Sequence, residues 1–120
     1  MKLLLGAAEG EAYFHLLDDL RHEVSDLEII QATGPAEVLG LVGEVDVLYG
    51  FPTAEVVAAA PRLRWIQSPS AGVEYVARVP DLVESPIVVT NTRGAHGPSI
   101  AEHVFALLLA FTRMSRPCTG

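Results

Sequence analysis

The stretch "LRWIQSPSAGVEYV", residues 63–76, decides the fold and also raises the question of function. It begins with a continuous apolar run at residues 63–67, which is typical of a strand buried on both faces of a parallel sheet. The loop that follows, residues 68–73, consists of small residues that leave the backbone bare. It could be a simple turn from strand to helix, or it could receive a small anion on successive N–H groups. The pattern alone leaves both interpretations open.

Four other short apolar runs share this continuous pattern and predict four more strands, at residues 3–7, 27–31, 45–49 and 87–90. Helical patterns fill the intervals, at residues 11–24, 34–45, 53–61 and 73–82. Thr53 is the predicted N-cap of the third helix. Strands that alternate with helices predict an α/β fold with an open, doubly wound parallel sheet. We expect the flavodoxin-like strand order 2-1-3-4-5.

The last helix is the best defined of these patterns. In "GPSIAEHVFALLLAFTR", residues 97–113, Ser99 precedes Glu102 by three positions, as in a capping box. From residue 104 to residue 111 the helix is apolar on every side, and no later element of this sequence can cover it. We therefore expect a long apolar helix that a partner covers, as in a homodimer, unless the chain is a piece of a longer protein. The predicted interface residues are Val104, Phe105, Leu107, Leu108, Leu109 and Phe111.

The composition is that of a globular protein of one domain. The chain has 120 residues and a net charge of -7, and its 8 Lys and Arg residues form no basic cluster, which argues against binding to nucleic acid. The longest apolar run, "VFALLLAF", is far shorter than the roughly 18 residues of a membrane span, so we expect no contact with a membrane. A single cysteine, Cys118, excludes a disulfide within the chain and suits a reducing cytoplasm.

The segment "NTRGAHGPS", residues 91–99, holds further candidate side chains. Asn91 directly follows a predicted strand, and we interpret it as a residue that caps the turn or ties two loops together. Arg93 could pair with an anion and His96 could act as an acid or base, but we prefer a solvated loop for both. Phe51, at the end of the third predicted strand, is a candidate for packing against a substrate side chain. The position of Phe51 fits an ordinary aromatic residue of a loop equally well.

Other sites find little support in the sequence. His15 and His22 lack the i, i+4 spacing of a metal-binding pair, so we expect no metal site. His103, expected in the first turn of the last helix, is interpreted as a packing or interface residue. No G-x-G-x-x-G or G-x-x-x-x-G-K-[ST] motif follows a predicted strand, which argues against a dinucleotide site or a P-loop in this chain. A receiver domain of the response-regulator type needs paired acidic residues after its first strand. Here the residues at that place, 6–8, are Gly-Ala-Ala, which argues against such a domain.

The second half of the chain resembles the D-isomer-specific 2-hydroxyacid dehydrogenase family, which includes D-3-phosphoglycerate dehydrogenase and the glyoxylate/hydroxypyruvate reductases. The resemblance rests on an A-G-V-[DE] loop at residues 71–74 and a V-x-N-T-x-G segment at residues 89–94. It also rests on an A-E-H helix start at residues 101–103, ahead of an L-L-L-A run. These motifs span residues 63–113 in the family's order and spacing. The first 60 residues fit the family's substrate domain in pattern only.

The resemblance implies a role for the bare loop. In the family, backbone N–H groups of the A-G-V loop hold the carboxylate of the substrate, which here implies Gly72 and Val73. Ser70 belongs to the same substrate-binding loop, and Ala71 would lie beside the cofactor. Asn91 would lie near the hinge and the active-site cleft. The implied substrate is a small 2-hydroxy or 2-keto acid, and the implied cofactor is NAD or NADP, bound by the full-length enzyme and not by this chain alone.

The resemblance also implies a division of the chain. Residues 1–98 correspond to the substrate domain, and residues 99–120 to the crossover helix and a tail. The family's nucleotide-binding domain, its catalytic Arg, Glu and His and its returning C-terminal segment have no counterpart in this sequence. We therefore expect the N-terminal part of an NAD(P)-dependent dehydrogenase, with no catalytic residue of its own and no activity alone. The alternative is a truncated, non-catalytic module for interaction or oligomerisation. A receiver-like domain is disfavoured because its acids are missing.

Overall fold

The computed structural model describes residues 1–6 and 14–113 of the chain. Its strands are β1 (Lys2–Leu5), β2 (Glu28–Gln31), β3 (Val47–Tyr49), β4 (Trp65–Gln67) and β5 (Val88–Thr90). Its helices are α1 (Phe14–Glu23), α2 (Pro35–Leu41), α3 (Ala54–Ala58), α4 (Pro80–Val83) and α5 (Gly97–Arg113), with 3-10 turns η2 (Val42–Glu44) and η3 (Val76–Arg78). The predicted helical residues 11–13, the side chain of His15, and Cys118 with its tail lie outside the part that the structure describes.

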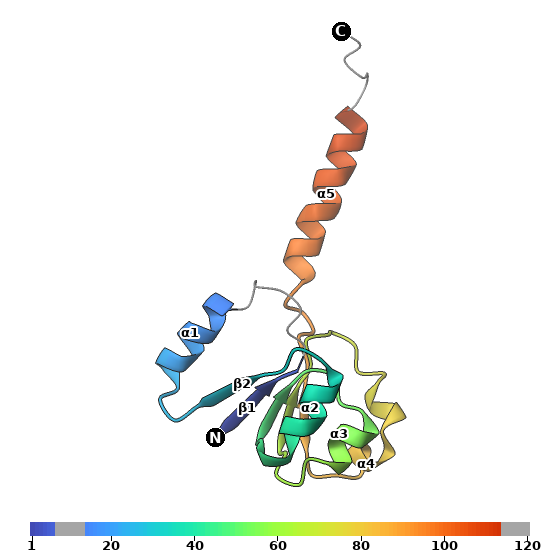
Figure 1. The fold of residues 1–120 in the computed structure, drawn as a ribbon. Helices are drawn as coiled ribbons and strands as arrows, with labels where there is room; N and C mark the ends of the chain where they lie inside the picture. Colours follow the sequence, from blue (N-terminus) through green and yellow to red (C-terminus); the bar gives the residue numbers. More distant parts are fainter. Residues whose placement is uncertain (7–13, 114–120) are drawn as a thin grey trace.

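The five strands form one parallel sheet in the order β2-β1-β3-β4-β5 (Figure 1). This is the predicted flavodoxin-like order, and each observed strand falls within one residue of its predicted run or inside it. In such a sheet the loops after all five strands lie at one edge, the carboxyl edge. The carboxyl edge therefore brings together segments that are far apart in the sequence.

One face of the sheet carries the main core. Leu4, Leu48 and Ile66 point to this face from the three central strands and are almost fully buried. Helices α2, α3 and α4 cover them, and each contributes one buried side chain, Val38, Val56 and Leu82 respectively. At the start of α3, the Thr53 hydroxyl accepts a hydrogen bond of 3.3 Å from the Val56 amide, as the predicted N-cap requires.

The opposite face is covered only in part, so the prediction of strands buried on both faces is wrong for β4 and β5. Leu17 of α1 packs there against Leu3, Leu5 and Val47. Figure 1 shows α1 beside β1 and β2, away from the other helices. In the described residues no helix reaches the same face of β4 and β5, which leaves Trp65 and the other outward side chains of these strands exposed.

Two predicted helices are shorter than their patterns suggested. The 34–45 pattern forms α2 and then the 3-10 turn η2, because Gly40 and Gly43 weaken the helix at this point. The 73–82 pattern forms η3 and then the short α4, because Pro80 lacks the N–H that a continuous helix needs. Both changes lie on the main-core side and leave the sheet order unchanged.

Helix α5 begins at Gly97, two residues before the predicted cap Ser99. The first turn is closed by the Ile100 amide, which donates a 2.9 Å hydrogen bond to the His96 carbonyl. Pro98 fits this first turn, where its missing N–H costs nothing. Because the helix starts before Ser99, the capping-box prediction is wrong. His103 consequently lies in the second turn of α5. The helix extends away from the sheet (Figure 1) and contains no buried residue. No described helix is long and apolar enough to cross a membrane.

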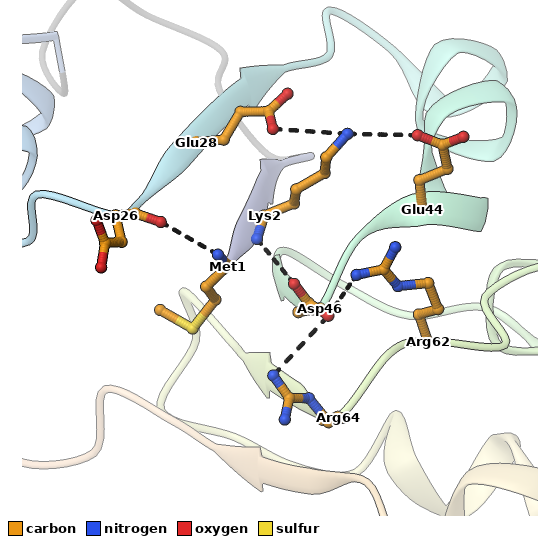
Figure 2. A network of polar contacts seen from close by, with 8 residues as sticks. All are labelled: Met1, Lys2, Asp26, Glu28, Glu44, Asp46, Arg62 and Arg64. Atoms are coloured by element: carbon orange, nitrogen blue, oxygen red, sulfur yellow. Dashed lines mark hydrogen bonds and ion pairs between the residues drawn. The ribbon is translucent and has the colours of Figure 1, made fainter.

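The amino edge of the sheet is held by charges, as Figure 2 shows. Asp46, directly before β3, is buried and accepts a 2.9 Å hydrogen bond from the Lys2 backbone amide of β1. The Asp46 carboxylate also contacts Arg62 at 3.3 Å and Arg64 at 3.8 Å, both near the start of β4. The Lys2 ammonium pairs with Glu28 at the start of β2 and with Glu44. This network joins four neighbouring strands at the end of the sheet opposite the candidate site.

Candidate functional site

The loop at residues 68–73 leaves the carboxyl end of β4 and is shaped by its two serines. Ser68 is fully buried, and its amide donates a 2.8 Å hydrogen bond to the Thr90 carbonyl of β5. The Ser68 hydroxyl accepts from the Ser70 amide at 3.2 Å, and the Ser70 hydroxyl accepts from the Gly72 amide at 3.1 Å. Serine hydroxyls favour such local turns to the backbone two residues on. The loop is therefore ordered by three of its backbone donors, the amides of Ser68, Ser70 and Gly72.

Two amides of the loop remain available to a ligand. The N–H groups of Ala71 and Val73 have no hydrogen-bond acceptor within the described residues, and both residues are exposed. The Gly72 amide, expected beside that of Val73 as a ligand donor, is instead held by the Ser70 hydroxyl. Successive N–H groups form a concave site for an anion, and here the two free groups flank the occupied Gly72 amide. A carboxylate, with two acceptor oxygens, matches this pair of donors.

Gly72 matters here because of close approach and not because of its backbone angle. Among the described residues, the glycines with positive φ are Gly50 and Gly94, and Gly72 is not one of them. A Cβ atom on Gly72 would lie against the Glu74 carboxylate, 2.7 Å from its Oε1. The lack of a side chain at Gly72 thus lets the Glu74 carboxylate lie close against the loop backbone.

The loop after β5 fixes the loop after β4 in place. The Asn91 side-chain amide donates to the Ala71 carbonyl at 3.1 Å, and the Asn91 side-chain oxygen accepts from the Arg93 amide at 3.2 Å. This arrangement confirms that Asn91 ties two loops and caps a turn. Thr92 adds two further bonds, from its amide to the Ser70 carbonyl at 3.2 Å and from its hydroxyl to the Pro69 carbonyl at 2.9 Å. Thr92 was not predicted, although it follows Asn91 at the same strand end.

A pocket of about 450 Å³ opens at the carboxyl ends of β2, β1 and β3, where the strand order changes direction. Ligands of doubly wound folds bind at such a switch point. Phe51 lines the pocket and meets the ring of Tyr75 edge-on, with centroids 5.7 Å apart and an interplanar angle of 88°. Tyr75 was not predicted as a site residue. Its hydroxyl is buried and has no hydrogen-bond partner in the described structure.

Glu37 fixes the rim of this pocket at the loop after β2. Its carboxylate accepts 2.8 Å hydrogen bonds from the Thr33 amide and from the Thr33 hydroxyl. These bonds, that of the amide first, lower the pKa of Glu37 below its ordinary value, because they favour the charged carboxylate. Thr33 itself lines the pocket. These bonds hold the rim in place, and the Glu37 carboxylate puts a negative charge beside it.

The remaining candidate residues contribute neither to the 68–73 loop nor to the pocket. Arg93 and His96 are exposed, as in the solvated loop that we preferred for them. His22 is exposed on α1, and His103 is exposed on α5. Residues 1–6 and 14–113 contain no group of His, Cys, Asp or Glu side chains that could hold a metal ion. The chain also has no G-x-G-x-x-G turn after any strand, so its residues do not fit a nicotinamide dinucleotide by themselves.

Comparison with known proteins identifies similar folds and a family. A D-isomer specific 2-hydroxyacid dehydrogenase family protein from Aeromonas salmonicida subsp. salmonicida A449 shares 31% identity over 95% of this chain, with a TM-score of 0.74. A protein from Thermus thermophilus shares 29% identity over 92% of the chain, with a TM-score of 0.65. A D-lactate dehydrogenase from Aquifex aeolicus, solved with NAD and lactic acid, has the same fold, with 20% identity over 89% of the chain and a TM-score of 0.66. A search of curated proteins found no match.

The chain covers 36% of the Aeromonas and Thermus proteins and 32% of the Aquifex enzyme, so it spans about a third of their length. The family model for the catalytic domain of the D-isomer specific 2-hydroxyacid dehydrogenases matches residues 5–118. That match includes the sheet from the end of β1 onward, both loops of the candidate site and all of α5. The chain belongs to the D-isomer specific 2-hydroxyacid dehydrogenase family.

Proposed function

We propose that this chain is the substrate-binding part of an NAD(P)-dependent D-2-hydroxyacid dehydrogenase, and that the 68–73 loop holds the carboxylate of a 2-hydroxy or 2-keto acid. The observation that carries the proposal is the pair of free amides on Ala71 and Val73 in an ordered loop. When a carboxylate binds, the Ser70 hydroxyl can rotate and release the Gly72 amide as a third donor. The net charge of -7 requires such local recognition, because the protein as a whole repels anions.

The chemistry itself would come from outside this chain. The sequence has no G-x-G-x-x-G turn for the dinucleotide, and the acidic side chain that lies against the loop is Glu74, beside Gly72. The residues of this chain would bind and orient the acid, and Ala71 would face the cofactor. Membership of the D-3-phosphoglycerate dehydrogenase and glyoxylate/hydroxypyruvate reductase branch and a cytoplasmic location are parts of the same proposal. The cofactor of the full-length enzyme is proposed to be NAD or NADP.

We also propose that α5 is the surface through which two copies associate. Its large apolar side chains are more than half exposed, and Phe111 is 83% exposed. Each such side chain contributes roughly 1.5–3 kcal/mol when it is fully buried. A contiguous exposed apolar surface of this kind marks an interaction site. The helix that follows the substrate domain would thus act as the dimer contact.

The binding proposal can be tested by amide NMR with two matched ligands. Pyruvate and pyruvamide share one skeleton, but only pyruvate carries a carboxylate. We expect pyruvate to shift the backbone amide signals of Ala71, Gly72 and Val73, and pyruvamide to leave them unchanged. The amides of Asp46 and Arg62, at the opposite, amino edge of the sheet, serve as an internal control. Equal effects of the two ligands, or no effect of pyruvate, would contradict the proposal.

A further inference from the structure

The pocket beside the carboxylate loop has a mostly apolar wall. Its floor and sides include Val38, Leu48, Val56 and the exposed ring of Phe51. Gly6 keeps the floor open, because a Cβ atom at this position would lie 3.1 Å from the Val38 methyl Cγ2. The volume of about 450 Å³ falls within the range of small-molecule sites. The pocket can therefore accept an apolar group of the size of an amino-acid side chain.

The aromatic contact between Phe51 and Tyr75 joins this pocket to the carboxylate loop. Phe51 comes from the end of β3, and Tyr75 lies two residues after Val73, one of the free donors. The Gly50 amide, next to Phe51, donates a 3.0 Å hydrogen bond to the Gln67 carbonyl at the end of β4. A ligand whose carboxylate sits on the loop would thus extend its other end past Phe51. Its tail would contact the aromatic pair and then enter the pocket.

The charged side chains that the structure describes along this path are negative. Gly6 and the segments 32–35, 50–53 and 68–74, which follow the first four strands, contain no Lys, Arg or His. Glu55 lines the pocket, and the Glu74 carboxylate borders Gly72. The candidate cation Arg93 belongs to the exposed loop after β5 and does not line the pocket. A second anionic group on the ligand would therefore meet like charges without a partner.

We infer that the substrate is a 2-hydroxy or 2-keto acid with an uncharged side chain, held against Phe51 in the switch-point pocket, and that acids with a second carboxylate or a phosphate are rejected there. This inference rests on the proposed function, because it needs the carboxylate on the 68–73 loop to orient the tail. It adds the side-chain class that the carboxylate site alone does not define, and within the proposed branch it favours uncharged acids of the glyoxylate/hydroxypyruvate reductase type over phosphoglycerate. Apolar tails gain from burial in the pocket, and anionic tails lose their hydration without compensation.

The test compares 4-methyl-2-oxopentanoate with 2-oxoglutarate, which have similar length and differ in the charge of the tail. Each is titrated into the 120-residue chain, and the backbone amides of Ala71, Val73, Gly34 and Thr53 are followed by NMR. We expect the first acid to bind at least about tenfold more tightly than 2-oxoglutarate. We expect its tail to shift the Gly34 and Thr53 signals, which report on the pocket.

A charge-reversal variant makes the test sharper. Phe51→Arg places a cation at the path of the tail, and it should cancel the preference or turn it toward 2-oxoglutarate by about tenfold, as expected for one added charge pair near the surface. The matched control is Val83→Arg, which adds the same charge at an exposed position of α4 outside the pocket. The control should keep the preference of the unmodified chain.

The outcomes separate this inference from the proposed function. If both acids shift Ala71 and Val73 but 2-oxoglutarate binds as tightly as 4-methyl-2-oxopentanoate, the inference is overturned and the carboxylate site stands. If neither acid moves the Ala71 and Val73 signals, the proposed function is overturned and the inference fails with it. An unchanged preference in Phe51→Arg would also overturn the inference, because the tail would then lie elsewhere.

Discussion

Asp46 shows how one buried carboxylate can make stability depend on pH. The hydrogen bond from the Lys2 backbone amide, followed by the contact with Arg62, holds the pKa of Asp46 below its ordinary value of 3.8. A group with a lowered pKa in the folded state stabilises the fold above its unfolded pKa. That contribution is present near pH 7, begins to fall near pH 4 and is lost as the pH drops through the folded value.

We therefore expect Asp46→Asn to lower the urea midpoint near pH 7. The difference from the unmodified chain should shrink steadily below pH 4 and vanish once Asp46 is protonated in both states. Urea unfolding at a series of pH values from 7 to 2 measures this convergence. The control is Asp81→Asn, which removes a carboxylate from an exposed position on α4. A constant difference between Asp46→Asn and the unmodified chain at all pH values would refute the role of the carboxylate charge.

Thr92 is the residue whose removal should loosen the candidate site most directly. Thr92→Val keeps the shape of the side chain but removes the hydroxyl that donates to the Pro69 carbonyl. We expect a loss of about 1 kcal/mol in the free energy of unfolding, because a part-buried hydrogen bond is lost. We also expect faster hydrogen exchange at the amides of residues 70–73.

Thr112→Val is the matched control for Thr92→Val. It removes a hydroxyl that donates to the Leu109 carbonyl at 3.1 Å on the exposed α5. Exchange at residues 70–73 should be the same in this control as in the unmodified chain. Equal exchange in both variants would mean that Thr92 does not hold the loop.

At the scale of elements, the exposed helix α5 should govern association. We expect the unmodified chain to sediment as a dimer and Leu108→Glu to shift the equilibrium toward monomer, because a charge would have to be buried in the contact. Val83→Glu introduces the same side chain on the exposed surface of α4 and should leave association unchanged. Sedimentation velocity over a range of concentrations measures both. A monomer for the unmodified chain at high concentration would count against the dimer.

The strands and their order were predictable, because a continuous apolar run is a local signal for a buried strand. The helix ends were less predictable. Val79, before Pro80, has a non-helical backbone conformation and ends η3, and Pro98 allows α5 to start two residues before Ser99. These ends depend on backbone geometry around single prolines. The uncovered face at Trp65 was not predictable either, since it depends on which helices reach that face.

The candidate site was predictable only where it is local. The small residues of the 68–73 loop pointed to bare amides, and Asn91 was expected to tie loops together. The partner that holds Gly72 and the contact between Phe51 and Tyr75 depend on the relative positions of side chains. Phe51 and Tyr75 are distant in the sequence and meet because β3 and β4 are neighbours in the sheet. No pattern within one segment carries that information.

For the molecule as a whole, we expect binding without turnover. The purified 120-residue chain, mixed with NADH and hydroxypyruvate, should show no loss of absorbance at the nicotinamide band above the rate without protein. The physical reason is that the sequence holds no dinucleotide turn to bring the cofactor to the loop. The Aquifex D-lactate dehydrogenase, solved with NAD and lactic acid, would serve as the positive control for the assay with pyruvate in place of hydroxypyruvate. A steady rate that co-purifies with the chain would contradict this expectation.

The two edges of the sheet carry different tasks, with the ion pairs of Asp46 at one edge and the ligand loops at the other. Three strand residues separate them along β3, a span of roughly 10 Å. Energetic effects of substitutions at such separated sites usually add. A gain in stability at the charged edge could therefore offset a loss caused by remodelling the loops. Substitutions in the ligand loops can change which ligand is bound, while substitutions at the charged edge restore the stability of the fold. The fold is therefore suited to evolutionary change in specificity.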